Sequence, residues 1–439
     1  MSPSITSQYL ARYRRLGTGG QPTDLLPLTG AQRRFVLARS LDAAGRPDVV
    51  PMFFAFPRGT VDTARLRAAA CHLAALHPAL RARPGVVRGT PVLRPAAPDV
   101  PLELLGCGPG EDVHTALRRA LAAWAAEGPP MRLYLAQGGP AAGEEVLAVV
   151  LDHAACDGQS LARIVKELGT AYRDGRGPAD VSTSAATTEL AAYRETVLLQ
   201  LDAEHRAAAP DALAYWGERL RAAGESAPLP RPGAVAAGAL PTGAAEALLP
   251  CPDGGAPFPS LLVACRAAAG ALFGAGAVSP LGYPWGGRPA GAPPVLGCFL
   301  NTVVFPAATG AGPFPPEATS EVTPDATAEA WWDDLDRADT PFDEVVHAAR
   351  SAGAPWSGRL DGMLTVDDVR RRPPLCLGGV EGREVHVDGR RIPAPFAFSV
   401  TQGPGLRLRM AWDRAVLDDR TAEEAFAAFR GALSSPVPA

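Results

Sequence analysis

The sequence predicts an α/β protein made of two lobes of similar size. Apolar strand-like runs alternate with amphipathic helical stretches along the chain, and this alternation is typical of mixed α/β folds. A length of 439 residues exceeds what one hydrophobic core usually organises. A polar segment rich in Gly, Ser and Thr at residues 175–188 indicates a linker. We therefore expect one lobe over residues 1–185 and a second, which includes a linker helix, over residues 186–439.

The composition indicates a globular protein with neither a nucleic-acid nor a membrane partner. Hydrophobic residues make up 47% of the chain and charged residues 20%, as in ordinary folded domains. A net charge of −4 offers no positive field for nucleic acid or anionic lipid. The chain has no run of about 18 apolar residues that could span a bilayer, and residues 1–21 lack the apolar centre of a signal peptide. These observations predict a cytoplasmic location.

The cysteines favour neither a disulfide framework nor a zinc site. The seven cysteines are scattered, and no two are arranged as Cys-x-x-Cys, which is the usual spacing of zinc and redox motifs. We therefore expect a reducing compartment and no bound metal.

Helix caps and hydrophobic spacing predict the elements of the first lobe. Thr29 and Asp62 each precede a helical pattern, and such side chains satisfy free N–H groups of a first turn. Further elements are expected as helices over residues 113–126 and 160–172 and as strands over residues 49–56, 131–136 and 146–151. The last of these strands is apolar without alternation, so both of its faces should be covered.

The second lobe repeats this style. A long helical stretch over residues 189–223 should break near Pro210, because proline interrupts helices, and a loop is expected over residues 228–243. The remaining elements are predicted as helices over residues 260–273, 327–335 and 421–433 and as strands near residues 295–305, 363–366 and 406–412.

The most specific chemical signal is the run from Val149 to Ser160. An apolar strand delivers His153, and Asp157-Gly158 follows one turn later at the start of a helix. Neutral imidazole accepts protons near physiological pH, so a histidine at a strand end suits a general base. Asp157 needs a cationic partner if it is buried. Asp157 or Ser160 can cap the helix, and Gly158 permits a backbone conformation or close approach that a Cβ would block.

This run resembles a known family signature. Residues 152–158 read Asp-His-Ala-Ala-Cys-Asp-Gly. They are similar to the His-His-x-x-x-Asp-Gly (HHxxxDG) motif of the condensation-domain superfamily of nonribosomal peptide synthesis, which includes acyltransferases like chloramphenicol acetyltransferase. Other stretches resemble condensation-domain segments in the right order, namely residues 27–32, 77–81, 129–133, 282–288 and 297–302. Together they extend the resemblance over most of the chain.

The resemblance implies two chloramphenicol-acetyltransferase-like lobes in a V, with His153 midway along a channel between them. It also implies substrates presented on the phosphopantetheine arms of acyl or peptidyl carrier proteins, or as coenzyme A esters, a small-molecule acceptor and no bound cofactor. The motif aspartate, Asp157, is then structural and pairs with an arginine, which its position in the sequence assigns to Arg288 across the lobes. Asn301 is expected to shape the channel floor.

One departure from the motif bears on the chemistry. Asp152 stands in place of the first histidine, and Asp152, Asp157 and Ser160 fit the Asp-x-x-x-x-Asp-x-x-Ser pattern of heterocyclising relatives. Those relatives generally lack the histidine that this chain keeps as His153, so ordinary acyl transfer is favoured. Asp152 is expected either to raise the basicity of His153 or to form a salt bridge nearby.

Three functions remain open. The favoured one is a free-standing condensation enzyme of natural-product biosynthesis that forms an amide or ester, with His153 as base and with Asp157 and Gly158 holding the turn. The second is an acyltransferase of the same fold that uses acyl-coenzyme A. The third is a non-catalytic condensation-like module that recruits partner proteins, at which Asp152 hints. Cys156 has no visible partner and is interpreted as a packing residue rather than a nucleophile.

Overall fold

The computed structural model describes residues 4–17, 25–42, 45–108, 110–124, 128–138, 143–252, 255–308, 324–369 and 372–434. Contacts group the chain into two compact units. The first unit comprises Met1–Arg206, Gly287–Leu300 and Arg371–Val387, and the second comprises Ala207–Gly286, Asn301–Arg370 and Asp388–Ala439. This grouping differs from a single boundary after residue 185, because two later segments return to the first unit.

A mixed sheet organises the first unit, with its described strands in the order β13-β1-β6-β5-β4. These strands are β1 (Val49–Pro57), β4 (Leu102–Gly106), β5 (Met131–Gln137), β6 (Glu144–Asp152) and β13 (Arg383–Glu384). β4 and β5 run parallel, and the other neighbours run antiparallel. β6 lies in the middle of the sheet, so hydrogen bonds hold it from both sides.

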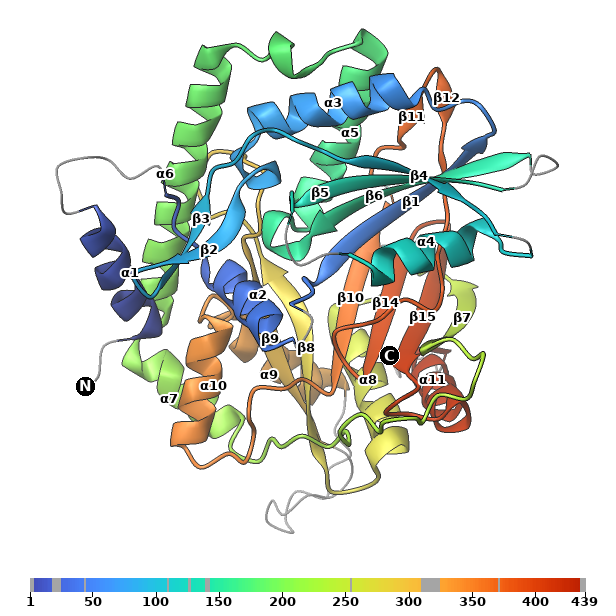
Figure 1. Ribbon diagram of the computed structural model, residues 1–439. Coiled ribbons are helices and arrows are strands. Elements are labelled where there is room, and N and C mark those ends of the chain that lie inside the picture. Colours follow the sequence, from blue (N-terminus) through green and yellow to red (C-terminus); the bar gives the residue numbers. More distant parts are fainter. Residues whose placement is uncertain are drawn as a thin grey trace. The chain divides into compact units, whose positions relative to one another are not determined.

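Helices cover both faces of this sheet. The described helices of the unit are α1 (Ile5–Leu16), α2 (Gly30–Leu41), α3 (Thr63–Leu76), α4 (Val113–Ala122), α5 (Gly158–Asp174) and α6 (Thr183–Ala207). α3 and α5 lie side by side over one face and α4 lies over the other (Figure 1). Along β6, Leu147 and Val149 belong to the hydrophobic cluster that includes α3 and α5, whereas Ala148 belongs to the cluster that includes α4. The prediction that both faces of this strand are covered is confirmed.

The structure confirms the predicted starts of α2 and α3 but not that of α6. Thr29 forms a capping box with Gln32, and Asp62 accepts from the N–H of Arg65, so both predicted caps are confirmed. The linker predicted over residues 175–188 connects α5 to α6 but ends earlier, because α6 already begins at Thr183. The Ser182 hydroxyl accepts from the N–H of Ala185 at 3.1 Å, and this contact stabilises the first turn.

Shorter elements complete the first unit. They are β2 (Arg83–Val87), β3 (Thr90–Arg94), β11 (Cys376–Leu377), β12 (Val380–Glu381) and the 3-10 turns η1 (Pro78–Leu80), η2 (His153–Ala155) and η3 (Pro178–Asp180). The predicted helix over residues 113–126 ends earlier, at Ala122, and its last two predicted residues lie outside the described ones.

The second unit has its own mixed sheet, with the described order β7-β15-β14-β10-β8-β9. Its strands are β7 (Thr242–Pro250), β8 (Val278–Gly286), β9 (Leu300–Ala308), β10 (Gly362–Asp368), β14 (Phe396–Gln402) and β15 (Gly405–Asp413). Its helices are α7 (Pro210–Arg219), α8 (Phe258–Phe273), α9 (Pro324–Leu335), α10 (Phe342–Ser351) and α11 (Asp419–Ser434). The core joins α8 and α11 to the buried side chains of β10, β14 and β15.

In the later half of the chain, one prediction is confirmed and several others differ from the structure. The break near Pro210 is confirmed, since α6 ends at Ala207 and α7 begins at the proline. The strands β7, β8 and β14 and the helix α10 were not predicted. The strand expected near residues 295–305 begins only at Leu300, because the carbonyls of Val295 and Gly297 accept from a side chain and not from a neighbouring strand.

Two further structural findings concern the whole described chain. The seven cysteines are free thiols. Within the described residues, no helix combines the length and the apolar character that crossing a bilayer requires.

Candidate active site

The candidate site begins where β6 ends. Asp152 is the last residue of the strand, and the N–H of His153 donates to the carbonyl of Asp48 at 2.9 Å. His153–Ala155 then form the turn η2, whose cap is Asp152: its Oδ1 accepts from the N–H of Ala154 at 2.9 Å. Backbone and side-chain hydrogen bonds therefore fix the turn that carries His153.

Asp157 caps α5. Its Oδ1 accepts from the N–H of Ser160 at 2.9 Å and lies 2.9 Å from the Ser160 hydroxyl. Of the two predicted caps, the structure uses Asp157, whose extended backbone precedes the first helical residue, Gly158. The Asp157 side chain has no exposed surface, so both of its oxygens need partners within the protein.

Arg288 supplies the cationic partner that a buried Asp157 requires. Its Nη1 lies 2.6 Å from Asp157 Oδ2, and its Nη2 donates to Ser160 Oγ at 2.9 Å. The Arg288 side chain is 10% exposed and the Asp157 side chain is 0% exposed. Arg288 belongs to the segment Gly287–Leu300 of the first unit, so the contact lies within one unit and not across two lobes.

The backbone after Arg288 completes this cluster. The guanidinium donates through Nη2 to the Val295 carbonyl at 2.8 Å and lies 4.7 Å from the centre of the Phe299 ring. The N–H of Phe299 donates to Asp157 Oδ2 at 3.1 Å. Because both carboxylate oxygens already accept from protein donors, Asp157 is suited to holding the turn and not to proton transfer.

His153 has a different environment. The residue is only partly buried, but its Nδ1 is buried and has no hydrogen-bond partner among the described residues. The imidazole stacks on Phe35 of α2, with ring centroids 4.2 Å apart and planes inclined by 16°. Since Nδ1 is enclosed by protein, Nε2 is the ring nitrogen that remains for proton exchange with a substrate.

Asp152 forms a salt bridge beside His153. Its Oδ2 lies 3.4 Å from Nη1 of Arg39, and the residue is 7% exposed. Burial raises the pKa of Asp152, against the opposing effects of the Ala154 N–H and the Arg39 charge. Of the two roles expected for Asp152, the structure provides the contact for the salt bridge.

Gly158 and Cys156 lie in the same motif as His153 and Asp157, but neither supplies a reactive side chain. A Cβ at Gly158 would meet no heavy atom within 4 Å, and its φ lies outside the positive range. The described residues therefore do not require a glycine at this position, contrary to the expectation, and the space beside Gly158 is open. Burial raises the pKa of the Cys156 thiol well above its usual value, which fits the interpretation as a packing residue.

Asn301 forms its described hydrogen bonds within the second unit. Its Nδ2 donates to the carbonyls of Ala338 and Thr340 at 2.7 and 2.6 Å. Its Oδ1 accepts from the N–H of Phe342 at 3.2 Å. The side chain thus anchors the loop that leads into α10, and its predicted place on a channel floor stays a prediction.

Sequence reasoning missed the contribution of α2 to the His153 turn. Phe35 and Arg39 reach His153 and Asp152, and Gln32 Nε2 donates to the Ala154 carbonyl at 2.8 Å. The common signal is their spacing of three and four residues along one helix, which places them on one face. That spacing does not reveal which distant segment the face contacts.

Comparisons with known proteins bear on this site. No protein-family model matches the chain. Over 443 residues the chain is 29% identical to CymA, a probable nonribosomal peptide synthetase of Salinispora arenicola (strain CNS-205); the match covers 94% of this chain and 6% of that protein.

Solved structures resemble the chain over nearly its full length. The X-domain from teicoplanin biosynthesis matches with a TM-score of 0.66 and 20% identity, over 95% of this chain and 97% of that one. The first condensation domain of the CDA synthetase matches with a TM-score of 0.66 and 19% identity, over 94% and 97%.

These matches show the fold of the chain. It is a mixed α/β fold of the chloramphenicol-acetyltransferase-like class, as predicted. Within that class, the chain shares its fold with the X-domain and the condensation domain compared above, in line with the resemblance found around His153.

Proposed function

We propose that the chain is a condensation enzyme that transfers an acyl group from a carrier-bound thioester to an amine or hydroxyl acceptor. The observation that carries this proposal is the turn at His153. A partly exposed imidazole there precedes a buried Asp157–Arg288 pair that fixes the start of the next helix. Such an arrangement offers one ring nitrogen to a substrate while the surrounding backbone stays in place.

In the proposed reaction, the acceptor nitrogen attacks the thioester carbonyl carbon. Nε2 of His153 accepts the proton that the nucleophile loses, a C–N bond forms and the C–S bond breaks. The proton then passes from His153 to the departing thiolate, which leaves as a thiol on its phosphopantetheine arm. A hydroxyl acceptor follows the same course with a C–O bond. No electrons are exchanged with a redox partner in this sequence.

Two points support this assignment of roles. Nδ1 of His153 is enclosed by protein, so Nε2 is the ring nitrogen that a substrate can reach. A carrier-bound donor is supported by the match to CymA, a probable nonribosomal peptide synthetase. Acyl or peptidyl carrier proteins are therefore the proposed partners, and coenzyme A esters are the alternative donors.

The test supplies the same acyl groups in two forms, as thioesters on carrier proteins encoded beside this chain and as coenzyme A esters. Amines, amino acids and alcohols serve as acceptors, and intact-protein and small-molecule mass spectrometry follow the products. We expect transfer from the carrier form, lost in His153→Ala with the fold intact. Equal transfer by both variants would remove His153 as the base, and transfer from coenzyme A alone would overturn the carrier donor.

A second candidate function is recruitment of a partner protein without catalysis. Two observations favour it: Asp152 replaces the first histidine of the motif, and an X-domain of similar fold, with a TM-score of 0.64, was solved in complex with OxyB. On this hypothesis, His153→Ala leaves the output of the pathway unchanged, whereas substitutions on an exposed surface abolish it. Loss of output in His153→Ala would exclude this candidate.

A further inference from the structure

An aromatic stack, and not a hydrogen bond at Nδ1, orients the ring of His153. A histidine base usually obtains its tautomer and orientation from a hydrogen bond at the other ring nitrogen. In His153 that nitrogen is buried and has no partner within the described part of the chain. The ring of Phe35 instead lies 4.2 Å away at 16°, close to parallel. This contact restrains the plane of the imidazole while Phe35 leaves the ring edge uncovered.

The same helix holds the residues on either side of His153. On one side, Gln32 Nε2 donates to the carbonyl of Ala154 at 2.8 Å. On the other side, Arg39 Nη1 lies 3.4 Å from Asp152 Oδ2. Three consecutive residues, from the end of β6 into the turn, are therefore each contacted by α2.

The spacing of these contacts explains why one helix makes all three. Gln32, Phe35 and Arg39 stand at positions i, i+3 and i+7, which form one stripe on a helix of about 3.6 residues per turn. They meet residues 154, 153 and 152, in that order. A shift of α2 along its axis would disturb all three contacts together.

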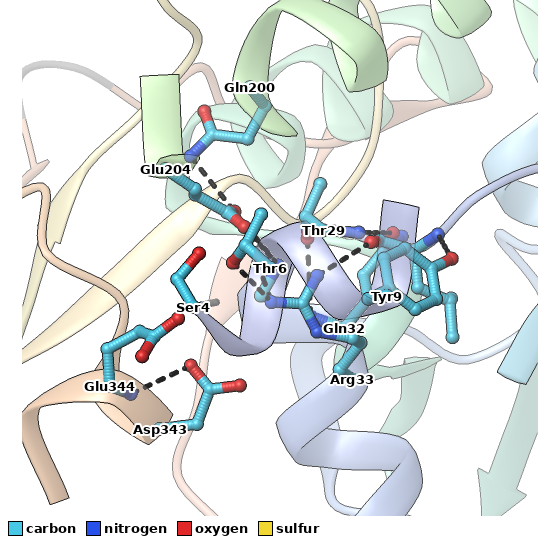
Figure 2. A network of polar contacts seen from close by, with 12 residues as sticks. Ser4, Thr6, Tyr9, Thr29, Gln32, Arg33, Gln200, Glu204, Asp343 and Glu344 are labelled. Atoms are coloured by element: carbon cyan, nitrogen blue, oxygen red, sulfur yellow. Dashed lines mark hydrogen bonds and ion pairs between the residues drawn. The ribbon is translucent and has the colours of Figure 1, made fainter. Parts of the chain in front are cut away.

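A polar network holds the start of α2 in place (Figure 2). The N–H of Gly30 donates to Glu204 of α6 at 2.8 Å, and Arg33 lies 3.6 Å from the same carboxylate. Arg33 also donates to Thr6 of α1 at 3.1 Å. Because Glu204 and Thr6 are buried, the network ties α2 to two other helices of the first unit.

We propose that this stripe of α2 is a positioning surface for the base of the reaction. Phe35 sets the plane of the His153 ring, and Arg39 sets the Asp152 carboxylate next to it. Both act through another residue, so they are positioning residues. The kinetic consequence rests on the proposed function, whereas the orientation of the ring does not depend on any substrate.

The decisive experiment observes the His153 ring directly. The full chain, with its seven histidines carbon-13-labelled in the ring, is studied by ¹H–¹³C NMR, and the His153 signals are assigned as those lost in His153→Gln. We expect one narrow set of signals in the wild type and in Phe35→Tyr, and broadened or split signals in Phe35→Leu and Arg39→Ala. The control is Leu37→Ala, since Leu37 lies on the same helix and is 60% exposed.

The kinetic arm separates positioning from simple stability. Phe35→Leu is expected to lower kcat of acyl transfer by up to about 100-fold with KM unchanged, and Phe35→Tyr is expected to restore it. Narrow, single His153 signals in both Phe35→Leu and Arg39→Ala would overturn the proposal, whether or not the chain transfers acyl groups. Broadened signals in a chain that transfers none would leave the positioning surface standing and overturn the proposed function instead.

Discussion

His77 and His153 of the first unit have opposite surroundings. His77 has no exposed side-chain surface, and both ring nitrogens contact carboxylates: Nε2 lies 2.6 Å from Glu167 and Nδ1 lies 2.8 Å from Glu189. Burial disfavours the charged ring, but the two hydrogen bonds outweigh it and raise the pKa of His77. The imidazole thus bridges the helices that carry Glu167 and Glu189, and its raised pKa favours the protonated ring.

His153, in contrast, is partly exposed and has an unpartnered Nδ1 within the described structure. Its ring contacts an aromatic face, and the carboxylate of the preceding residue, Asp152, is already paired with Arg39. The comparison teaches that the partners of the ring nitrogens decide whether a histidine is held as a link between helices or keeps a nitrogen free of protein contacts, as the proposed function requires of His153. Its consequences can be tested on each histidine separately.

The largest effect is expected on catalysis by His153. His153→Gln should lower the rate of acyl transfer by about 10²–10⁴-fold, the usual contribution of a general base, while the thermal midpoint stays close to that of the wild type. His114→Gln is the control, since His114 is also partly buried in this unit. An unchanged rate in His153→Gln would show that His153 is not the base.

The next largest effect is expected at the Asp157–Arg288 pair that supports the His153 turn. Arg288→Ala should lower the free energy of unfolding by about 3–5 kcal/mol, because it leaves a buried carboxylate without its charge partner. Urea unfolding measures this loss. Arg420→Ala is the control: Arg420 and Glu424 also form a close pair, at 3.0 Å, but their side chains are 88% and 61% exposed, so its loss should cost less than about 1 kcal/mol. Equal costs for the two pairs would contradict the structural role of Asp157.

A smaller, pH-dependent effect is expected at His77. His77→Gln removes a donor from Glu167 and Glu189 and should cost about 1–3 kcal/mol. The pKa of His77 is raised, so the stability it contributes is complete below the unfolded value of about 6.5 and is lost as pH rises through the folded pKa.

Glu167 sets the lower limit of the pH range over which His77 and its carboxylate partners stabilise the fold. Burial acts to raise the pKa of Glu167, but its contacts with His77 and Arg163 lower it overall. Its contribution is therefore present above the unfolded value of about 4.3 and fades at lower pH. The stability difference between wild type and His77→Gln, measured by urea unfolding across pH, should be largest between these limits. A flat difference would show that His77 is not a charged bridge.

Gly158→Ala is expected to stabilise the fold by about 0.4–1 kcal/mol, because alanine restricts the unfolded chain and meets no clash in the native backbone. Urea unfolding gives the stability, and the acyl-transfer assay gives the activity. A more stable but inactive variant would show that a substrate uses the open space beside Gly158. Destabilisation would contradict the backbone geometry described above.

The smallest effect is expected at Asp152. Burial raises the pKa of this carboxyl, so the native state is penalised by its charge as pH rises above the unfolded value of about 3.9. Asp152→Asn, which keeps an acceptor for the Ala154 N–H, should therefore be at least as stable as the wild type at neutral pH. The difference should vanish in acid, as measured by thermal unfolding across pH. Marked destabilisation at neutral pH would show that the pair with Arg39 outweighs the cost of burial.

Several local features of this protein follow from short stretches of its sequence. The caps at Thr29 and Asp62, the covered strand before His153 and the break at Pro210 follow from the bonding of a few adjacent residues. The α/β class and the condensation-domain resemblance rest on the same short-range patterns. They could be predicted because capping, pleating and proline geometry act within a few residues.

The contacts between distant segments could be known only from the folded structure. Arg288 reaches Asp157 across 131 residues of sequence, and Gln32 reaches Ala154 across 122. The strand β8 was missed because Pro280 and Pro284 lie in it and weaken any strand pattern. Which helix face meets which turn depends on long-range packing and on the pairing of buried charges. These forces act between residues that the order of the sequence does not bring together.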